Sequence, residues 1–317
     1  VIFNPVKENL DLSQKIQKII ESFHPKPDEI SVAVVDLKQS EVQIAGYNLD
    51  HFIYPASIYK VFVAAEILRQ IDVGERKLED TVEIVLVNEV DTDNPRFFPK
   101  STHKDYRPLL KTGDKVTLDY LLDLMLTRSD NTAANVLIDI ADRENINKHI
   151  ILKNGWSGSD VTRKFLDRLK EEEEYRISKI TVSNARHLAE LFYKIETGEL
   201  VSPCVSRQLK TYLLRWNRDR RSGLNLPEFK SYYRKGGWLQ INGYKWNVWR
   251  GIKASFSKGY AVIKYSGDVG VVEGHNSHYV VAVLSILKTK WPWQNFPLKK
   301  LSKEIYALME SENIRSK

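Results

Sequence analysis

Apolar residues recur with two different spacings over the first fifty positions of the chain. Between residues 9 and 23 they stand three or four apart, which predicts an amphipathic helix. Residues 30–35 and 42–47 are instead short, largely apolar runs separated by a polar stretch at 36–40. These runs predict two neighbouring strands joined by a turn.

Helical spacing returns in the middle of the chain. Residues 61–68 are strongly apolar and predict a buried helix, and residues 118–126, 132–140 and 184–195 predict three more. The stretch 197–203 contains a glycine and a proline, which typically follow a helix end. Residues 72–115 are rich in charge, proline and aspartate, so we expect loops and short elements there.

Strand patterns reappear late. The Val-rich runs 269–272 and 279–284 flank a loop at 273–278 and predict a hairpin, and residues 301–309 predict a closing helix. This order predicts an α+β protein, in which N- and C-terminal helices flank an antiparallel sheet and an all-helical lobe is inserted in sequence. We expect the sheet lobe to hold residues 1–57 and 230–317, and the helical lobe to hold residues 58–229 with its loops.

A Ser-x-x-Lys motif, Ser57 to Lys60, stands at the start of the buried helix. Residues three apart share a helix face, so Lys60 is expected beside the Ser57 hydroxyl. A serine hydroxyl is a poor nucleophile until a base takes its proton, and a lysine can be that base if desolvation lowers its pKa. The same pattern occurs at 101–104, 255–258 and 285–288, but there no long apolar helix follows. The alternative for Ser57 is a plain helix cap.

Two further motifs follow in order. Ser129-Asp130-Asn131 lies between two predicted helices, where the alternative interpretation is a turn that caps the second helix. Lys235-Gly236-Gly237-Trp238 comes after the helical block, at the expected start of a strand. The literal Lys-Thr-Gly at 111–113 precedes Ser129 in a polar turn and is rejected, whereas Lys258-Gly259-Tyr260 stays open as a rival that lacks the second glycine.

In this order the three motifs resemble those of class A β-lactamases and penicillin-binding D-Ala-D-Ala peptidases. The resemblance reaches from about residue 30 to the last helix. It implies a β-lactamase/transpeptidase-like fold with the active site between the lobes, and a nucleophile, Ser57, that forms an acyl-enzyme with Lys60 as base. No cofactor is implied.

The resemblance also assigns the other motif residues. Ser129 would relay a proton to the leaving nitrogen, Asp130 would brace its loop, and Asn131 would hold the substrate amide and Lys60. Lys235 would supply positive charge near Ser129 and the substrate carboxylate. Gly237 would let the substrate approach, and the Trp238 amide would complete an oxyanion hole with that of Ser57.

Two departures from the family pattern stand out. Gly236 replaces the usual Thr or Ser, so a hydroxyl that would bind the substrate carboxylate is missing. Residues 239–265 look like an aromatic and basic insertion, for which a substrate-binding flap and a long hairpin packed on the sheet are equal alternatives.

Deacylation separates the possible activities. Class A β-lactamases activate water with a glutamate in a Glu-x-x-x-Asn loop, and nothing between residues 131 and 181 matches it. The nearest candidates, Glu171 and Glu172, open an acidic run that also fits a solvated helix face. We therefore expect a D,D-peptidase-like serine hydrolase, acylated by D-Ala-D-Ala-like peptides or β-lactams. A class A-like β-lactamase is the first alternative, and a catalytically degenerate cell-wall-binding protein is the second.

The composition of the chain limits the kinds of partner that the protein is expected to bind. The net charge is +7, but basic residues are interleaved with acids and no nucleic-acid-binding motif accompanies them. No apolar run approaches the ~20 residues of a membrane span. The single Cys204 and the pair His275 and His278 do not predict a metal site. We expect a monomer acting on a small molecule. No secretion signal is visible, and the exported location, periplasmic or extracellular, is what the resemblance implies.

Overall fold

The computed structural model describes residues 7–39, 41–88, 107–162, 181–215, 231–242, 262–290 and 293–315. Their contacts divide the chain into two compact units, each made of separate segments. The sheet unit comprises Val1–Ile58, Val182–Tyr193 and Asp219–Lys317, and the helical unit comprises Tyr59–Thr181 and Lys194–Arg218. Residues 182–193 thus group with the sheet, whereas the sequence had suggested the helical lobe for them.

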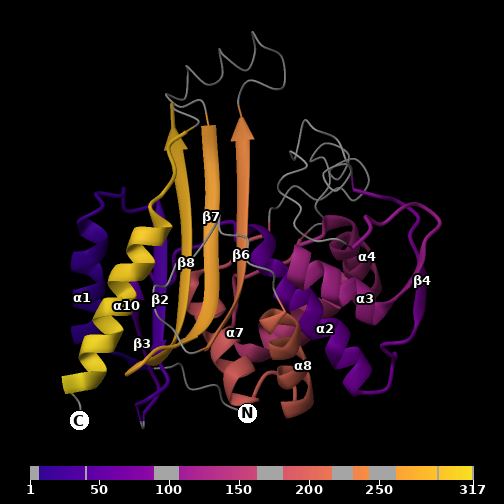
Figure 1. Cartoon of the computed structure of the whole chain (residues 1–317), viewed down its shortest axis with the longest axis horizontal. Helices are drawn as coiled ribbons and strands as arrows, with labels where there is room; N and C mark the ends of the chain where they lie inside the picture. Colours follow the sequence, from indigo (N-terminus) through magenta and orange to yellow (C-terminus); the bar gives the residue numbers. More distant parts are fainter. Residues whose placement is uncertain are drawn as a thin grey trace. The chain divides into compact units, whose positions relative to one another are not determined.

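The sheet unit is built on six strands in the order β1-β3-β2-β8-β7-β6 (Figure 1). Every neighbouring pair is antiparallel except β1 with β3, so the predicted α+β class with an antiparallel sheet is confirmed. β6 stands at the edge and pairs with β7 along all of its length. The strands are β1 (Lys7–Glu8), β2 (Ile30–Asp36), β3 (Gln43–Tyr47), β6 (Ser231–Asn242), β7 (Val262–Glu273) and β8 (His278–Thr289).

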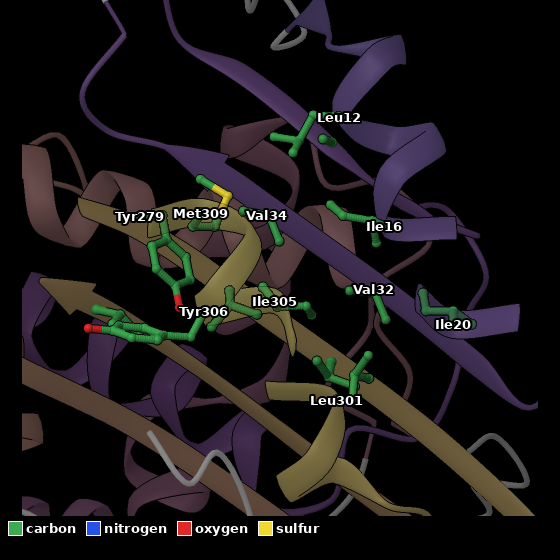
Figure 2. Packing of buried hydrophobic residues seen from close by; sticks show 14 of the residues in the cluster. Leu12, Ile16, Ile20, Val32, Val34, Tyr279, Leu301, Ile305, Tyr306 and Met309 are labelled. Atoms are coloured by element: carbon green, nitrogen blue, oxygen red, sulfur yellow. The ribbon is translucent and has the colours of Figure 1, made fainter. Parts of the chain in front are cut away.

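Two helices from opposite ends of the sequence cover one face of this sheet. They are α1 (Leu10–Glu21), whose first turn is capped by the Asn9 side chain, and α10 (Leu298–Arg315). Figure 2 shows their apolar side chains meeting those of the central strands. The buried cluster includes Leu12, Ile16, Ile20, Val32, Val34, Tyr279, Val281, Leu301, Ile305 and Met309. Burial of such side chains from water is the main term that stabilises the unit.

The helical unit is centred on α2 (Lys60–Asp72), in which ten of thirteen residues are buried. That agrees with the continuous apolar run in its sequence. Around it the structure has α3 (Leu118–Asp123), the π-helix η4 (Leu124–Arg128), α4 (Asn131–Ala141), α5 (Arg143–Asn145), η5 (Ile146–Ile151), η6 (Leu152–Asn154) and α8 (Pro203–Leu214). A small ladder of β4 (Thr81–Glu83) and β5 (Lys115–Thr117) belongs to the same unit. The helix α7 (Ala185–Thr197) contributes residues to both units.

None of the helices in the described part of the chain has both the length and the apolar character that crossing a membrane requires.

His187 on α7 makes the stability of the sheet unit depend on pH. Burial lowers its pKa from 6.5 to about 4; Asp50 partly offsets this and Arg186 reinforces it. The unfolded chain therefore binds more protons between pH 6.5 and pH 4, so the free energy of unfolding falls as the pH falls through that window. We expect protonation of this ring to lower the free energy of unfolding by about 2 kcal/mol, a value reduced from that of a fully buried ring because His187 keeps some contact with solvent.

Urea unfolding at a series of pH values measures this loss. The His187→Gln variant should show a flatter acid limb than the wild type, and His24→Asn, which alters an exposed ring, should not. Identical acid limbs for the wild type and His187→Gln would contradict the assignment.

Candidate active site

Ser57 lies in the short 3₁₀-helix η1 (Ala56–Tyr59), and α2 begins directly after η1, at Lys60. Ala56 has a φ of +48°, in the left-handed region that residues with a side chain seldom adopt. The turn is closed by the Ile58 amide, which donates to the Pro55 carbonyl over 3.2 Å. Ser57 is half-buried. The local backbone therefore presents this serine from a constrained turn at the start of a helix.

The strand β6 approaches the backbone of this turn very closely at Gly237. A methyl group added there would lie 2.6 Å from the Ser57 nitrogen and 2.9 Å from the Pro55 carbonyl oxygen. Real side-chain carbons do not come so near, so only glycine fits at this point. The third motif thereby lies beside the amide of Ser57, and the next residue, Trp238, is half exposed.

Lys235 and Gly236 precede this contact on β6. Lys235 is fully buried, and its Nζ lies 3.5 Å from the Gly236 carbonyl oxygen. Gly236 stands opposite Asp268 of β7, and an added methyl group would meet the Asp268 Oδ2 at 3.5 Å, an ordinary contact. Asp268 forms a buried ion pair with Arg234. Position 236 therefore has room for the first carbon of a side chain.

The helical unit holds the other motif residues around the amine of Lys60. This Nζ donates to the Ser129 carbonyl at 2.6 Å and to the Asn131 Oδ1 at 2.7 Å. The Ser129 hydroxyl and the Asp130 carbonyl lie farther away, each at 3.3 Å. The Lys60 side chain is fully buried. These four oxygens are uncharged and belong to a single turn, so the turn fixes where the amine lies.

The backbone of this turn has two unusual features. Ser129 ends the π-helix η4 with a φ of +60°, and π-helical turns occur frequently at functional sites. Asp130 then caps α4, because its Oδ1 accepts from the Ala133 amide at 2.8 Å. Its Oδ2 pairs with the Arg128 guanidinium at 2.8 Å. The Asp130 carboxylate is thus engaged in holding the loop.

The structure brings the predicted residues together within each unit. Ser57 lies with Lys235, Gly236, Gly237 and Trp238 in the sheet unit, and Lys60 lies with Ser129, Asp130 and Asn131 in the helical unit. The catalytic roles assigned to these residues stay predictions.

Several sequence alternatives fall elsewhere. Glu171, Glu172 and the rival motif at 258–260 lie outside the described residues. The literal motif at 111–113 forms a turn in which the Asp114 side chain accepts from the Lys111 amide. Residues 239–242 and 262–265 of the supposed insertion extend the β6–β7 hairpin, and the rest of it lies outside the described residues.

Sequence reasoning missed the charged residues behind the motifs. Arg234 of β6 forms an ion pair with Asp268 of β7, next to the third motif in sequence. Arg128, which precedes the second motif, donates to the Arg107 carbonyl and so connects this motif to residue 107. Among the described residues no group of three or more His, Cys, Asp or Glu could hold a metal ion.

Comparison with protein families matches residues 11–309 to a family described as the beta-lactamase enzyme family. A search of curated protein sequences finds no match. Among solved structures, the chain is similar to a beta-lactamase from Sphaerobacter thermophilus DSM 20745, with a TM-score of 0.64, 18% identity, and coverage of 97% of this chain and 98% of that chain.

Two further structures show the same likeness. The TLA-1 extended-spectrum beta-lactamase has a TM-score of 0.69 and 15% identity, with 94% of this chain and 99% of that chain covered. A mutant of PBP-A, solved as an acyl-enzyme complex with penicillin G, has a TM-score of 0.64 and 19% identity, with 97% and 99% covered. At these identities the likeness concerns the fold.

Proposed function

The chain belongs to the beta-lactamase enzyme family, and from that premise we propose that it is a serine hydrolase of the penicillin-recognising type, acylated at Ser57 by β-lactams or D-Ala-D-Ala-like peptides. One observation carries the proposal. The buried amine of Lys60, three residues after Ser57, is held by the Ser129 carbonyl and the Asn131 side chain. A fully buried lysine whose amine is fixed in place by the second motif suits a group that exchanges a proton with a neighbouring hydroxyl.

In the proposed acylation step Ser57 Oγ attacks the carbonyl carbon while Lys60 Nζ takes the hydroxyl proton. The negative charge that develops on the carbonyl oxygen is stabilised by the backbone amides of Ser57 and Trp238. The close contact between Gly237 and the Ser57 nitrogen supports this pair of donors. The bond from the carbonyl carbon to the leaving nitrogen then breaks, and the proton that Lys60 took reaches that nitrogen through Ser129, whose hydroxyl lies 3.3 Å from Lys60 Nζ. Lys235 would contribute positive charge to this step.

The fate of the acyl-enzyme distinguishes a peptidase from a β-lactamase. We propose the D,D-peptidase type, because no Glu-x-x-x-Asn sequence follows Asn131 before residue 181. A β-lactamase would need a base for water, for which Glu171 and Glu172 are the candidates. We propose further that the protein is exported, to the periplasm or beyond the cell, and acts there as a monomer on peptidoglycan peptides.

Intact-mass spectrometry over time with a chromogenic cephalosporin tests the proposal. A penicillin-binding peptidase should gain the mass of one drug molecule within minutes and keep it for hours, with little colour change. Rapid colour change without a lasting adduct would establish the β-lactamase alternative. Neither an adduct nor turnover with a panel of β-lactams would refute acylation by this class and favour a degenerate wall-binding protein.

A further inference from the structure

The Ser129–Asn131 turn directs two consecutive carbonyl groups at Lys60. This arrangement depends on the left-handed backbone of Ser129, which follows a π-helical rather than an α-helical turn. Both conformations are uncommon, and the left-handed one is disfavoured for a residue with a side chain, so they persist only where neighbouring groups hold them. The neighbours of η4 therefore decide how firmly the acceptors of Lys60 are placed.

Arg107 is bound to two residues of that segment. Its guanidinium forms an ion pair with the Asp123 carboxylate at the start of η4, and its Nη2 donates to the Thr127 hydroxyl at 2.7 Å. The Thr127 hydroxyl in turn donates to the Asp123 carbonyl at 2.6 Å. A hydroxyl bound to the carbonyl four residues earlier bends a helix. Arg107 thus binds a residue near each end of η4, the turn that precedes Ser129.

The second motif also reaches back to Arg107. The Arg128 Nη1 donates to the Arg107 carbonyl at 3.1 Å and to the Pro108 carbonyl at 3.3 Å. The Nη2 atom of the same guanidinium donates to the Asp130 carboxylate at 2.8 Å. The Arg128 and Asp130 side chains are almost fully buried, at 5% and 2% exposed, so solvent screens their pairing little. The two arginines therefore connect residues 107–108 to the segment that ends in the second motif, each binding the other's segment. We refer to these interactions together as the Arg107 latch.

We propose that Arg107 is a positioning residue for acylation, which acts through η4 and the Ser129–Asn131 turn on the amine of Lys60. The proposal rests on the proposed function of Lys60 as the base. Arg107 needs no contact with the substrate. Its loss lets the turn relax toward ordinary helical backbone, which moves the Ser129 and Asp130 carbonyls away from the amine and misplaces Lys60 relative to the Ser57 proton.

The test compares Arg107→Gln with Arg215→Gln. Arg215 also faces Asp123, at 3.6 Å, but its side chain is 55% exposed and so makes a matched control. Stopped-flow acylation by a fluorescent penicillin should show the acylation rate constant of Arg107→Gln reduced about 10- to 100-fold, because small misplacements have effects of that size. The dissociation constant of the initial complex should change less than about threefold. Arg107→Lys, which keeps the charge, should recover part of the rate.

Two results would overturn the proposal: an acylation rate within twofold of the wild type for Arg107→Gln, or an equal loss in Arg215→Gln. Thr127→Val, a change of similar volume, provides a second test in case Arg107→Gln does not fold. It removes the hydroxyl that Arg107 binds and should also lower the acylation rate constant. A Thr127→Val rate equal to that of the wild type would also count against the latch.

Hydrogen exchange measured by mass spectrometry separates this proposal from the proposed function. Peptides covering residues 124–133, which include the Asp130-bound amide of Ala133, should exchange faster in Arg107→Gln than in the wild type or Arg215→Gln. If the wild type is never acylated but this difference is seen, the latch stands and the proposed function fails. Unchanged exchange in Arg107→Gln would refute the latch itself.

Discussion

Replacing Ser57 by alanine is expected to abolish the covalent adduct with penicillin. The substitution removes the one oxygen that would form the acyl bond, while the Ser57 backbone amide and the constrained turn remain. Loss of a nucleophile that acts with its base lowers acylation by at least about 10³-fold, below what labelling detects. Reversible binding of the drug should persist, since the substitution leaves unchanged the residues of β6 that are proposed to bind it. Intact-mass spectrometry and fluorescent-penicillin labelling measure the two properties.

Ser285→Ala is the matched control for this experiment. Ser285 opens another Ser-x-x-Lys sequence, but it lies on β8, where its hydroxyl donates to the Ser266 carbonyl at 2.9 Å. This variant should label like the wild type. An adduct that survives in Ser57→Ala would show that another residue is the nucleophile, and peptide mapping of the adduct would identify it.

Gly237→Val is expected to reduce acylation by about 10²- to 10³-fold, the size of effect seen when an oxyanion donor is lost. The first side-chain carbon alone would stand 2.6 Å from the Ser57 nitrogen and 2.9 Å from the Ala56 Cβ, so β6 has to move away from the turn. That movement separates the Ser57 and Trp238 amides. The acylation rate constant, measured on samples shown to be folded by circular dichroism, gives the result.

Gly236→Ala offers the comparison one position earlier on the same strand. There an added methyl group makes only ordinary contacts, with the Asp268 carboxylate at 3.5 Å. We expect acylation within about threefold of the wild type, in line with a surface-like substitution that meets no clash. Equal losses in the two variants would mean that close approach of β6 to the Ser57 turn is not what the reaction needs.

Periodicity predicted the elements whose buried positions are consistently apolar. The helix at residues 9–23 and the strands at 30–35 and 42–47 agree with α1, β2 and β3 to within one or two residues. The strand predicted at 269–272 extends in fact over Val262–Glu273. Its first half was missed because polar side chains occupy inward positions there and are satisfied by partners far along the chain.

Lys264 and Asp268 are the clearest cases of such polar positions on β7. The Lys264 amine donates to the Gln294 carbonyl at 2.7 Å and to the Asn295 side chain at 2.9 Å, and Asp268 pairs with Arg234. No local pattern encodes those partners. The helix α8, by contrast, had a readable signal, since Ser202 and Pro203 mark a helix start as well as the end of the preceding helix.

The candidate site was predictable only as far as its short motifs. Ser57, Lys60 and the Ser129–Asn131 turn follow from residue type, order and helical context. The Arg107 latch does not, because a salt bridge between residues sixteen positions apart leaves no periodic trace in the sequence. The sequence does not reveal which charged side chains become neighbours, because that depends on tertiary packing.

The position of Gly237 beside Ser57 also has a consequence for when the site forms. The Ser57 turn emerges early in synthesis, whereas β6, its partner β7 and the next strand β8 come from the last third of the chain. Contacts between such distant segments are slow to form and appear only after a large loop has closed. A nascent chain that ends before β6 carries its serine without the neighbouring strand. Penicillin labelling would therefore report completed folding of the sheet, and a pulse-chase experiment could time its assembly.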